Sequence, residues 1–169
     1  MGGWNAIALA GDIAAVDGGH WDPEDPTNFR YYSLLDVSDP ESVTRVGLIE
    51  LPDPAGHAAF LGDTLLLANR WHGLTQVNVA DPTAPVVGRS ILFDGSAAHA
   101  LAATSSAAYI GSIARDNGLV AVDLADPTSP TPVRLLPGEQ APQDLRVDGA
   151  VRCRTVPDPG LRHGSGDRG

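Results

Sequence analysis

The chain lacks lysine and long hydrophobic runs, and each absence excludes a class of protein. All 11 basic residues among its 169 are arginines, and they are outnumbered by 21 acidic residues, so the formal net charge is −10. A nucleic-acid-binding protein needs a basic surface, which this balance does not supply. No apolar run approaches the roughly 20 residues of a membrane-spanning helix. We therefore expect no nucleic-acid partner and no membrane span.

Cysteine is nearly absent as well. Cys153 is the only one, which excludes an internal disulfide and a zinc site with several cysteines, and we interpret it as an ordinary thiol. Residues 1–12 have neither a basic segment nor a long apolar one, so they do not resemble a secretory signal peptide. We expect either an intracellular protein or a gene that lacks its true beginning.

Turn-forming residues are abundant. The chain has 19 glycines, 14 prolines and, among its acidic residues, many more aspartates than glutamates. These residue types favour turns and disfavour helices. The composition therefore argues against a helical bundle and for many short elements joined by tight turns.

One motif recurs three times. Its copies are YYSLLDVSDP at residues 31–40, GLTQVNVADP at 73–82 and GLVAVDLADP at 118–127, so that their Asp-Pro pairs are 42 and 45 residues apart. In the second unit, four apolar stretches of strand length are separated by turn signals, at 57–61, 64–69, 74–79 and 86–93. Four antiparallel strands in each 40–50 residues are typical of a β-propeller blade. A β-sandwich and a solenoid remain as alternatives.

The repeated motif resembles the LVIVD repeat, which is named for an apolar run ending in Asp. The second copy departs from this pattern with Asn78, where the others have Asp36 and Asp123. The third copy has Ser105 and Ser106 where the second has the turn Gly62-Asp63. The resemblance covers residues 5–151 and implies a β-propeller, often on the cell surface of bacteria and archaea, without a defined activity.

The predicted fold is all-β, with about three four-stranded antiparallel blades plus one strand, which makes a partial propeller. We place the blades at about 5–51, 57–93 and 98–136, the start of a fourth at about 143–151, and a disordered or irregular tail at 152–169. Propellers close with about four to eight blades. The chain is therefore expected to be a fragment of a larger propeller, to close by self-association, or to fold alone as an open fan.

The tail is rich in arginine, with four of the 11 in residues 152–169. It is interpreted as a basic contact with an acidic partner, as a disordered end, or as the product of a shifted reading frame.

Blade topology places the candidate binding residues on one loop face. Loops between the second and third strands, together with the crossovers between blades, share that face and carry four of the five histidines. The residues predicted for this binding face are His20, Trp21, His57, Arg70, Trp71, His72, His99 and Arg115. Trp71 with Arg70 could stack on a sugar ring or a peptide side chain.

His57 and His99 are predicted at equivalent positions, where the innermost strand of each blade begins near the axis. Imidazole binds zinc, copper or iron, but a metal site needs three or more ligands. A metal ion held by these two histidines is thus the alternative to polar contacts between blades, and no other cofactor is expected. The turn motifs are interpreted as structural, namely Asp39, Pro40, Gly62, Asp63, Asp81, Pro82, Asp126 and Pro127.

No enzyme signature is present, since the chain has no G-x-S-x-G, H-E-x-x-H or phosphate-binding loop motif. The favoured function is a non-enzymatic repeat module that binds a protein or glycan partner through one loop face, as part of a larger surface protein. The alternative is a propeller enzyme or metal-binding protein that uses His57 and His99. The resemblance suggests the cell envelope or the extracellular side, although residues 1–12 show no signal peptide.

Overall fold

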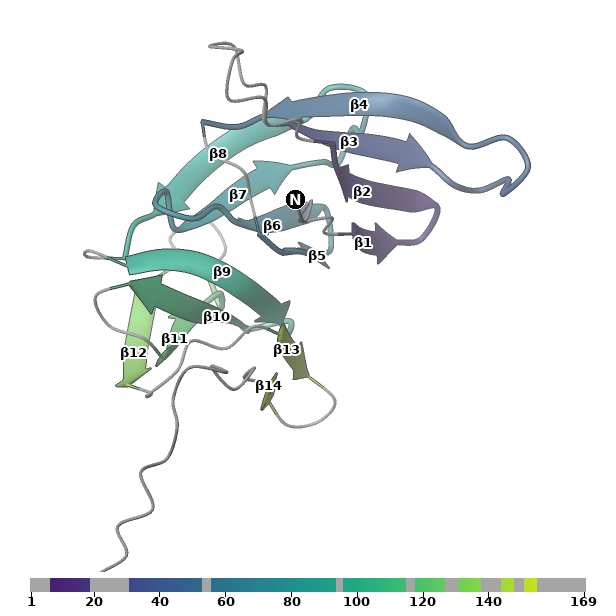
Figure 1. Ribbon diagram of the computed structural model, residues 1–169. Coiled ribbons are helices and arrows are strands. Elements are labelled where there is room, and N and C mark those ends of the chain that lie inside the picture. Colours follow the sequence, from purple (N-terminus) through teal and green to yellow (C-terminus); the bar gives the residue numbers. More distant parts are fainter. Residues whose placement is uncertain are drawn as a thin grey trace, which may run out of the picture.

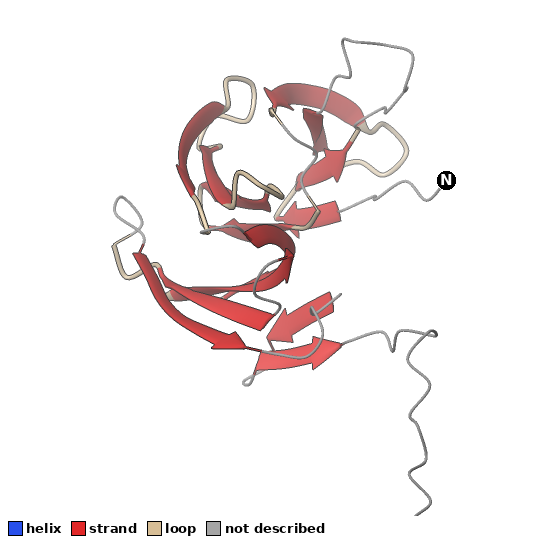
Figure 2. Ribbon diagram, turned by 60° about the vertical axis from the view of Figure 1, so that its left-hand side comes forward, coloured by secondary structure: helices blue, strands red, loops and turns tan. Residues whose placement is uncertain are grey.

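The computed structural model describes residues 7–18, 31–52, 56–93, 96–114, 118–126, 131–137, 144–147 and 151–154. Every regular element within these ranges is a strand (Figure 2). In the same ranges there is no helix of the length and apolarity needed to cross a bilayer.

Twelve strands form three four-stranded antiparallel sheets, each in chain order (Figure 1). The first sheet contains β1 (Ile7–Ala10), β2 (Ile13–Asp17), β3 (Tyr31–Asp36) and β4 (Thr44–Glu50). The second contains β5 (Ala58–Leu61), β6 (Thr64–Ala68), β7 (Leu74–Asn78) and β8 (Val86–Ile91). The third contains β9 (Ser96–Ala103), β10 (Ala107–Ala114), β11 (Gly118–Asp123) and β12 (Thr131–Pro137). The all-β fold of four-stranded antiparallel blades is therefore confirmed.

A two-stranded hairpin follows the third blade and changes one expectation about the tail. It pairs β13 (Asp144–Val147) with β14 (Val151–Arg154), so residues 152–154 form part of a strand instead of an irregular tail. The sequence of β14 alternates apolar and charged residues, which is the two-residue period of a strand. The two arginines of this strand led us to interpret residues 152–154 as part of the tail. Residues 155–169 lie outside the described part of the chain.

Tight turns join the first and second strands of each blade. Gly11 and Gly62 both have a φ of +54°, a left-handed conformation that glycine adopts without steric cost. The third blade has Ser105 and Ser106 at this turn, and Thr104 supports it there. The Thr104 hydroxyl accepts a hydrogen bond from the backbone N–H of Ala107 at 3.0 Å.

The core consists of layers between successive blades. Adjacent residues on β6 point to opposite faces, so Leu67 packs in the core shared with the first blade and Leu66 in the core shared with the third. A smaller core joins the third blade to the hairpin through Leu145. The innermost strands β1, β5, β9 and β13 lie in sequence around the centre of the molecule (Figure 1).

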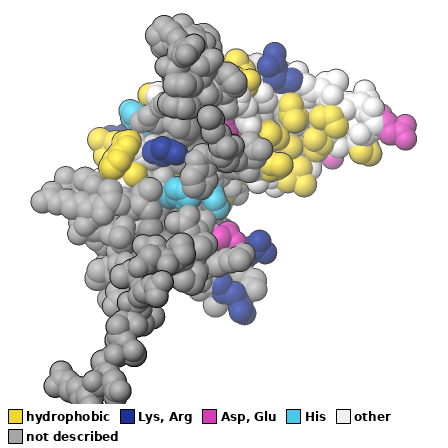
Figure 3. Space-filling view, in the orientation of Figure 1, with side chains coloured by type: hydrophobic (Ala, Val, Ile, Leu, Met, Phe, Trp, Pro, Cys, Tyr) yellow, Lys and Arg dark blue, Asp and Glu magenta, His cyan; other side chains and the backbone are white. Residues whose placement is uncertain are grey.

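One flank of the first blade is apolar and exposed. Ile7 and Leu9 are 68% and 65% exposed. Counted from the Gly11 and Gly62 turns, they are equivalent to Ala58 and Phe60, which pack against the core between the first and second blades. Hydrophobic side chains gather on this side of the molecule (Figure 3). The flank therefore has the character of a surface between blades.

The outermost strand of each blade pairs irregularly with its neighbour. Register shifts interrupt β4 opposite Leu34 and Leu35, β8 opposite Thr75 and Val77, and β12 opposite Ala121 and Val122. Such β-bulges bend a strand and increase its local twist.

Candidate binding face

A tight turn between β6 and β7 presents Trp71, which is 58% exposed. The turn is closed by a hydrogen bond from the backbone N–H of Asn69 to the carbonyl oxygen of Gly73 at 2.7 Å. The N–H of His72 donates to Asn69 at 2.8 Å, and that of Gly73 donates to Arg70 at 3.0 Å. We call residues 69–73 the Trp71 turn. These internal hydrogen bonds fix the backbone from which the Trp71 side chain projects.

The Trp71 turn is also anchored to its surroundings. The N–H of Ala98 in the third blade donates to the carbonyl oxygen of Arg70 at 2.8 Å. Gly73 has a φ of +70°, and a Cβ atom there would lie 1.8 Å from the carbonyl oxygen of Ile91. Only glycine satisfies both constraints. Beneath the turn, the amide Nδ2 of the buried Asn69 donates to the Thr75 hydroxyl at 3.3 Å.

Arg70 adopts an unusual backbone conformation, with a φ of +39°. It is the one non-glycine residue with a positive φ among the described residues. Such conformations cost of order 1 kcal/mol or more and concentrate at functional sites. The strain occurs directly before the exposed tryptophan, which marks this turn as the strongest functional candidate in the described part of the chain.

His57 and His99 come together from adjacent blades. Their ring centroids are 6.0 Å apart, and the ring planes are inclined by 43°. His57 immediately precedes β5, whereas His99 lies inside β9 at the residue that the pairing with β10 skips, between Ala98 and Ala100. A β-bulge at His99 therefore accompanies their approach.

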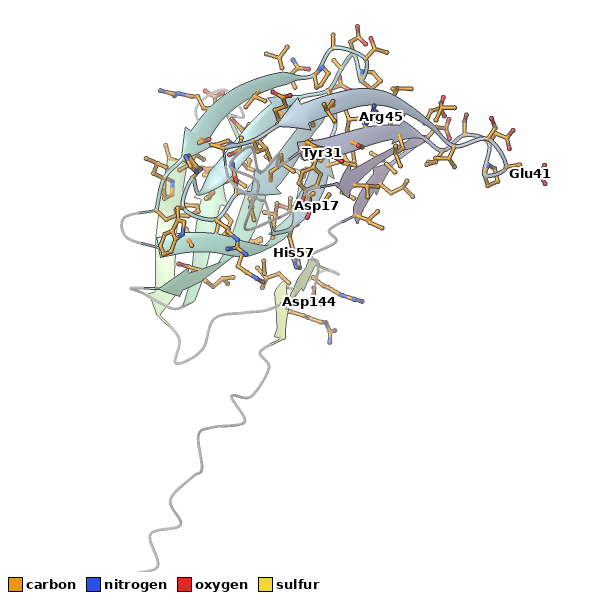
Figure 4. All side chains as sticks on the ribbon, turned by 45° about the horizontal axis from the view of Figure 1, so that its top comes forward. Asp17, Tyr31, Glu41, Arg45, His57 and Asp144 are labelled. Carbon is orange, nitrogen blue, oxygen red and sulfur yellow. The ribbon has the colours of Figure 1, made fainter. Side chains whose placement is uncertain are left out.

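Arg70 and Asp144 extend this pair into a group of four charged or titratable side chains. Burial lowers the pKa of His57, and the Asp144 carboxylate partly opposes that shift. Burial lowers the pKa of His99 too, and the positive charges of His57 and Arg70 lower it further. We call these four residues the histidine cluster. Figure 4 shows Asp144 of β13 next to His57.

The cluster reaches the surface at the middle of the molecule. His57, Arg70 and Asp144 are partly exposed, while His99 is only 5% exposed. The space-filling view shows histidine surface with an acidic side chain next to it (Figure 3). The region where the second blade, the third blade and the hairpin meet thus combines a buried and an accessible imidazole.

A metal ion held by His57 and His99 stays a prediction. No group of three or more histidine, cysteine, aspartate or glutamate side chains suited to a metal occurs among the described residues. Arg70 also places a positive charge near His99, which opposes a cation.

The remaining predicted face residues are only partly described. His72 follows Trp71 in the same turn and is partly exposed. His20, Trp21 and Arg115 lie outside the described residues. Asp144 was not among the residues predicted for this face, although Gln143 or Asp144 stands where the repeat places the next equivalent of His57 and His99.

The aspartates of the repeat hold turns. Side-chain oxygens of Asp36, Asn78 and Asp123 each accept a hydrogen bond from the backbone N–H two residues later, at 2.8–2.9 Å. Asn78 therefore makes the same contact as the aspartates, because a turn of this kind needs only the side-chain oxygen. In the Asp-Pro pairs, Asp39 and Asp81 accept bonds from the N–H groups of Glu41 and Thr83, both at 2.9 Å.

Other turn residues have comparable roles. The Thr83 hydroxyl donates to Asp81 at 2.6 Å, and this contact lowers the pKa of the Asp81 carboxyl. The carbonyl oxygen of Asp63 accepts a bond from the N–H of Val79 at 2.8 Å. Pro40 and Pro82 follow their aspartates within the described turns, and Asp126 is exposed. Pro127 lies outside the described residues.

Three four-stranded antiparallel sheets with their innermost strands side by side define a β-propeller-type repeat module. Residues 108–134, which run from β10 into β12, match the LVIVD repeat. The resemblance read from the sequence is therefore confirmed in the third blade. The matched residues include Asp123, which caps the turn after β11.

A solved structure of low sequence identity supports the fold. The chain is similar to the crystal structure of the computationally designed Ika4 protein, with a TM-score of 0.60 and 12% identity over 86% of this chain and 81% of that one. A structure of an S. cerevisiae Dbp5 variant bound to Nup159, a Gle1 variant, IP6 and ADP gives a TM-score of 0.46 and 13% identity, over 83% of this chain and 35% of that one. No curated protein matches in sequence.

Proposed function

We propose that this module is a non-enzymatic recognition domain that binds a glycan through the face around Trp71. The observation that carries the proposal is an exposed tryptophan on a turn held by hydrogen bonds to two blades. A rigid aromatic side chain presents a large contact area at a small entropic cost. Sugar rings can stack on such a surface, and the polar groups of Arg70 and His72 are next to it in the chain.

The proposal requires no cofactor. The competing hypothesis of a metal-dependent activity rests on His57 and His99. The positive charge of Arg70 near His99 opposes a bound cation, which supports glycan binding over metal chemistry. A location on the cell surface, which the LVIVD resemblance implies, would bring the module into contact with glycans. A protein partner is the other class that an exposed tryptophan could serve.

A glycan array probed with the full chain tests the proposal, followed by titration of the best ligand against wild type and Trp71→Ala. We expect Trp71→Ala to weaken binding about tenfold or more, because an aromatic hot spot contributes at least about 1.4 kcal/mol. Val86→Ala is the matched control, since Val86 is also exposed but lies on the outer strand β8. Equal loss in both variants, or no glycan bound by wild type, would overturn the proposal.

A further inference from the structure

Side chains that carry or can acquire a positive charge gather at the Trp71 turn. Arg70 precedes Trp71 in the chain, and its backbone is hydrogen-bonded to Ala98, the neighbour of His99. His57 approaches from the start of β5, with its ring centroid 6.0 Å from that of His99. Three side chains that carry, or can acquire, a positive charge thus converge from two blades.

Among the described residues, one carboxylate faces this group, and it is shared. The charge of Asp144 raises the pKa of His57 against the effect of burial. The Oδ2 atom of Asp144 also lies 3.4 Å from Nε of Arg146 on the same strand. Arg146 is well exposed, so that ion pair is weak but still competes for the carboxylate. Asp144 can balance only one positive charge. Protonating both imidazoles therefore leaves these four described side chains with an excess of positive charge.

The geometry suits a small oxyanion. Charge-assisted N–H···O bonds span about 2.7–2.9 Å, and the partly exposed His57 can offer an N–H to a carboxylate while the buried His99, with its ring centroid 6.0 Å away, adds positive charge when protonated. The guanidinium of Arg70 adds the donor type that binds carboxylates best. The net charge of the chain, −10, repels a polyanion at long range far more than a ligand with one charge.

We infer that the glycan recognised by this face carries a single carboxylate per binding unit, as in a uronic acid, with the sugar ring on Trp71 and the carboxylate at Arg70 and His57, beside the buried His99. This inference rests on the function proposed above and specifies its ligand. An anion among these groups removes the repulsion between them and favours protonated imidazoles. Binding should therefore take up protons and strengthen as the pH falls.

The test compares glucuronate with glucose, which lacks the carboxylate, by titrating the full chain at about pH 5.5 and about pH 8. Ligand-induced changes in the NMR spectrum provide the readout. We expect glucuronate to bind about tenfold more tightly than glucose at the lower pH, as a charge-assisted contact implies, and the preference to shrink at the higher pH.

Arg70→Asn is the decisive variant, because asparagine tolerates the positive φ of this position. It should reduce the glucuronate-to-glucose affinity ratio to near one, and His57→Gln should flatten its pH dependence. Arg89→Asn, at an exposed position on β8, is the matched control and should keep the ratio.

The outcomes separate the two proposals. Glucose and glucuronate binding equally, both through Trp71, would overturn this inference and leave the glycan proposal standing. An acidic peptide or acetate binding as tightly as glucuronate, with no effect of Trp71→Ala, would overturn both. A preference for glucuronate that survives Arg70→Asn would also contradict the inference.

Discussion

Stacking of one blade on the next makes a sharp prediction for Leu66. Its side chain on β6 is completely buried in the core between the second and third blades. Truncating a fully buried leucine to alanine costs about 2–5 kcal/mol, so we expect Leu66→Ala to lower the free energy of unfolding by about 3 kcal/mol. At about 2–4 °C per kcal/mol for a chain of this size, the melting temperature should fall by roughly 6–12 °C.

Two companion variants show whether stacking is responsible. Leu67→Ala removes an equally buried side chain from the opposite face of β6 and should cost a similar amount. Leu48→Ala lies on β4, where the side chain is 41% exposed, and should cost less than about 1 kcal/mol. Urea denaturation followed by circular dichroism measures all three. If Leu66→Ala proves as mild as Leu48→Ala, the second and third blades do not pack together in solution.

Three further predictions concern the core, the Trp71 turn and the histidines. Tyr32 is buried, and its hydroxyl has no hydrogen-bond partner within the described residues. Tyr32→Phe should therefore leave the free energy of unfolding unchanged or raise it by up to about 1 kcal/mol, measured by urea denaturation. A clear loss of stability would mean that the hydroxyl does have a hydrogen-bond partner. Gly73→Ala should destabilise by more than about 1 kcal/mol, measured by urea denaturation, because its Cβ would collide with Ile91; wild-type stability would show that the turn is not held as described. The folded-state pKa values of His57 and His99 lie below the ordinary value, so the unfolded chain binds more protons as the pH falls through about 6.5. Stability should therefore decrease from about pH 7 to about pH 5 in a pH series of urea melts, and an equally steep profile in His99→Gln would contradict this cause.

The strands could be predicted from the sequence because the repeat marks their ends. In the second unit, the apolar stretches at 57–61, 64–69, 74–79 and 86–93 correspond to β5, β6, β7 and β8 with differences of one or two residues. Turn residues with fixed backbone preferences, such as Gly62, separate them. Local chemistry therefore determined both the existence and the limits of these strands.

The histidine cluster was less accessible to sequence reasoning. The spacing of the repeat predicts that His57 and His99 occupy equivalent positions near the axis. The bulge at His99 and the positive φ of Arg70 cannot be predicted from the residue types at these positions. Only the packing of one blade on the next decides which loop side chain approaches the imidazoles. Asn78 shows the opposite case, since an apparent departure from the motif keeps the same hydrogen bond.

The bulges in the outermost strands have a consequence for association. Among the described residues, β4, β8 and β12 each have one edge without a partner strand in their own sheet, where the backbone could pair with a strand from another molecule and start a continuous fibre. Each of these strands carries a register shift against its neighbour, and the extra twist makes the edge a poor template for a straight incoming strand. The bulge in the outermost strand of each blade thus opposes edge-to-edge pairing between molecules at every blade.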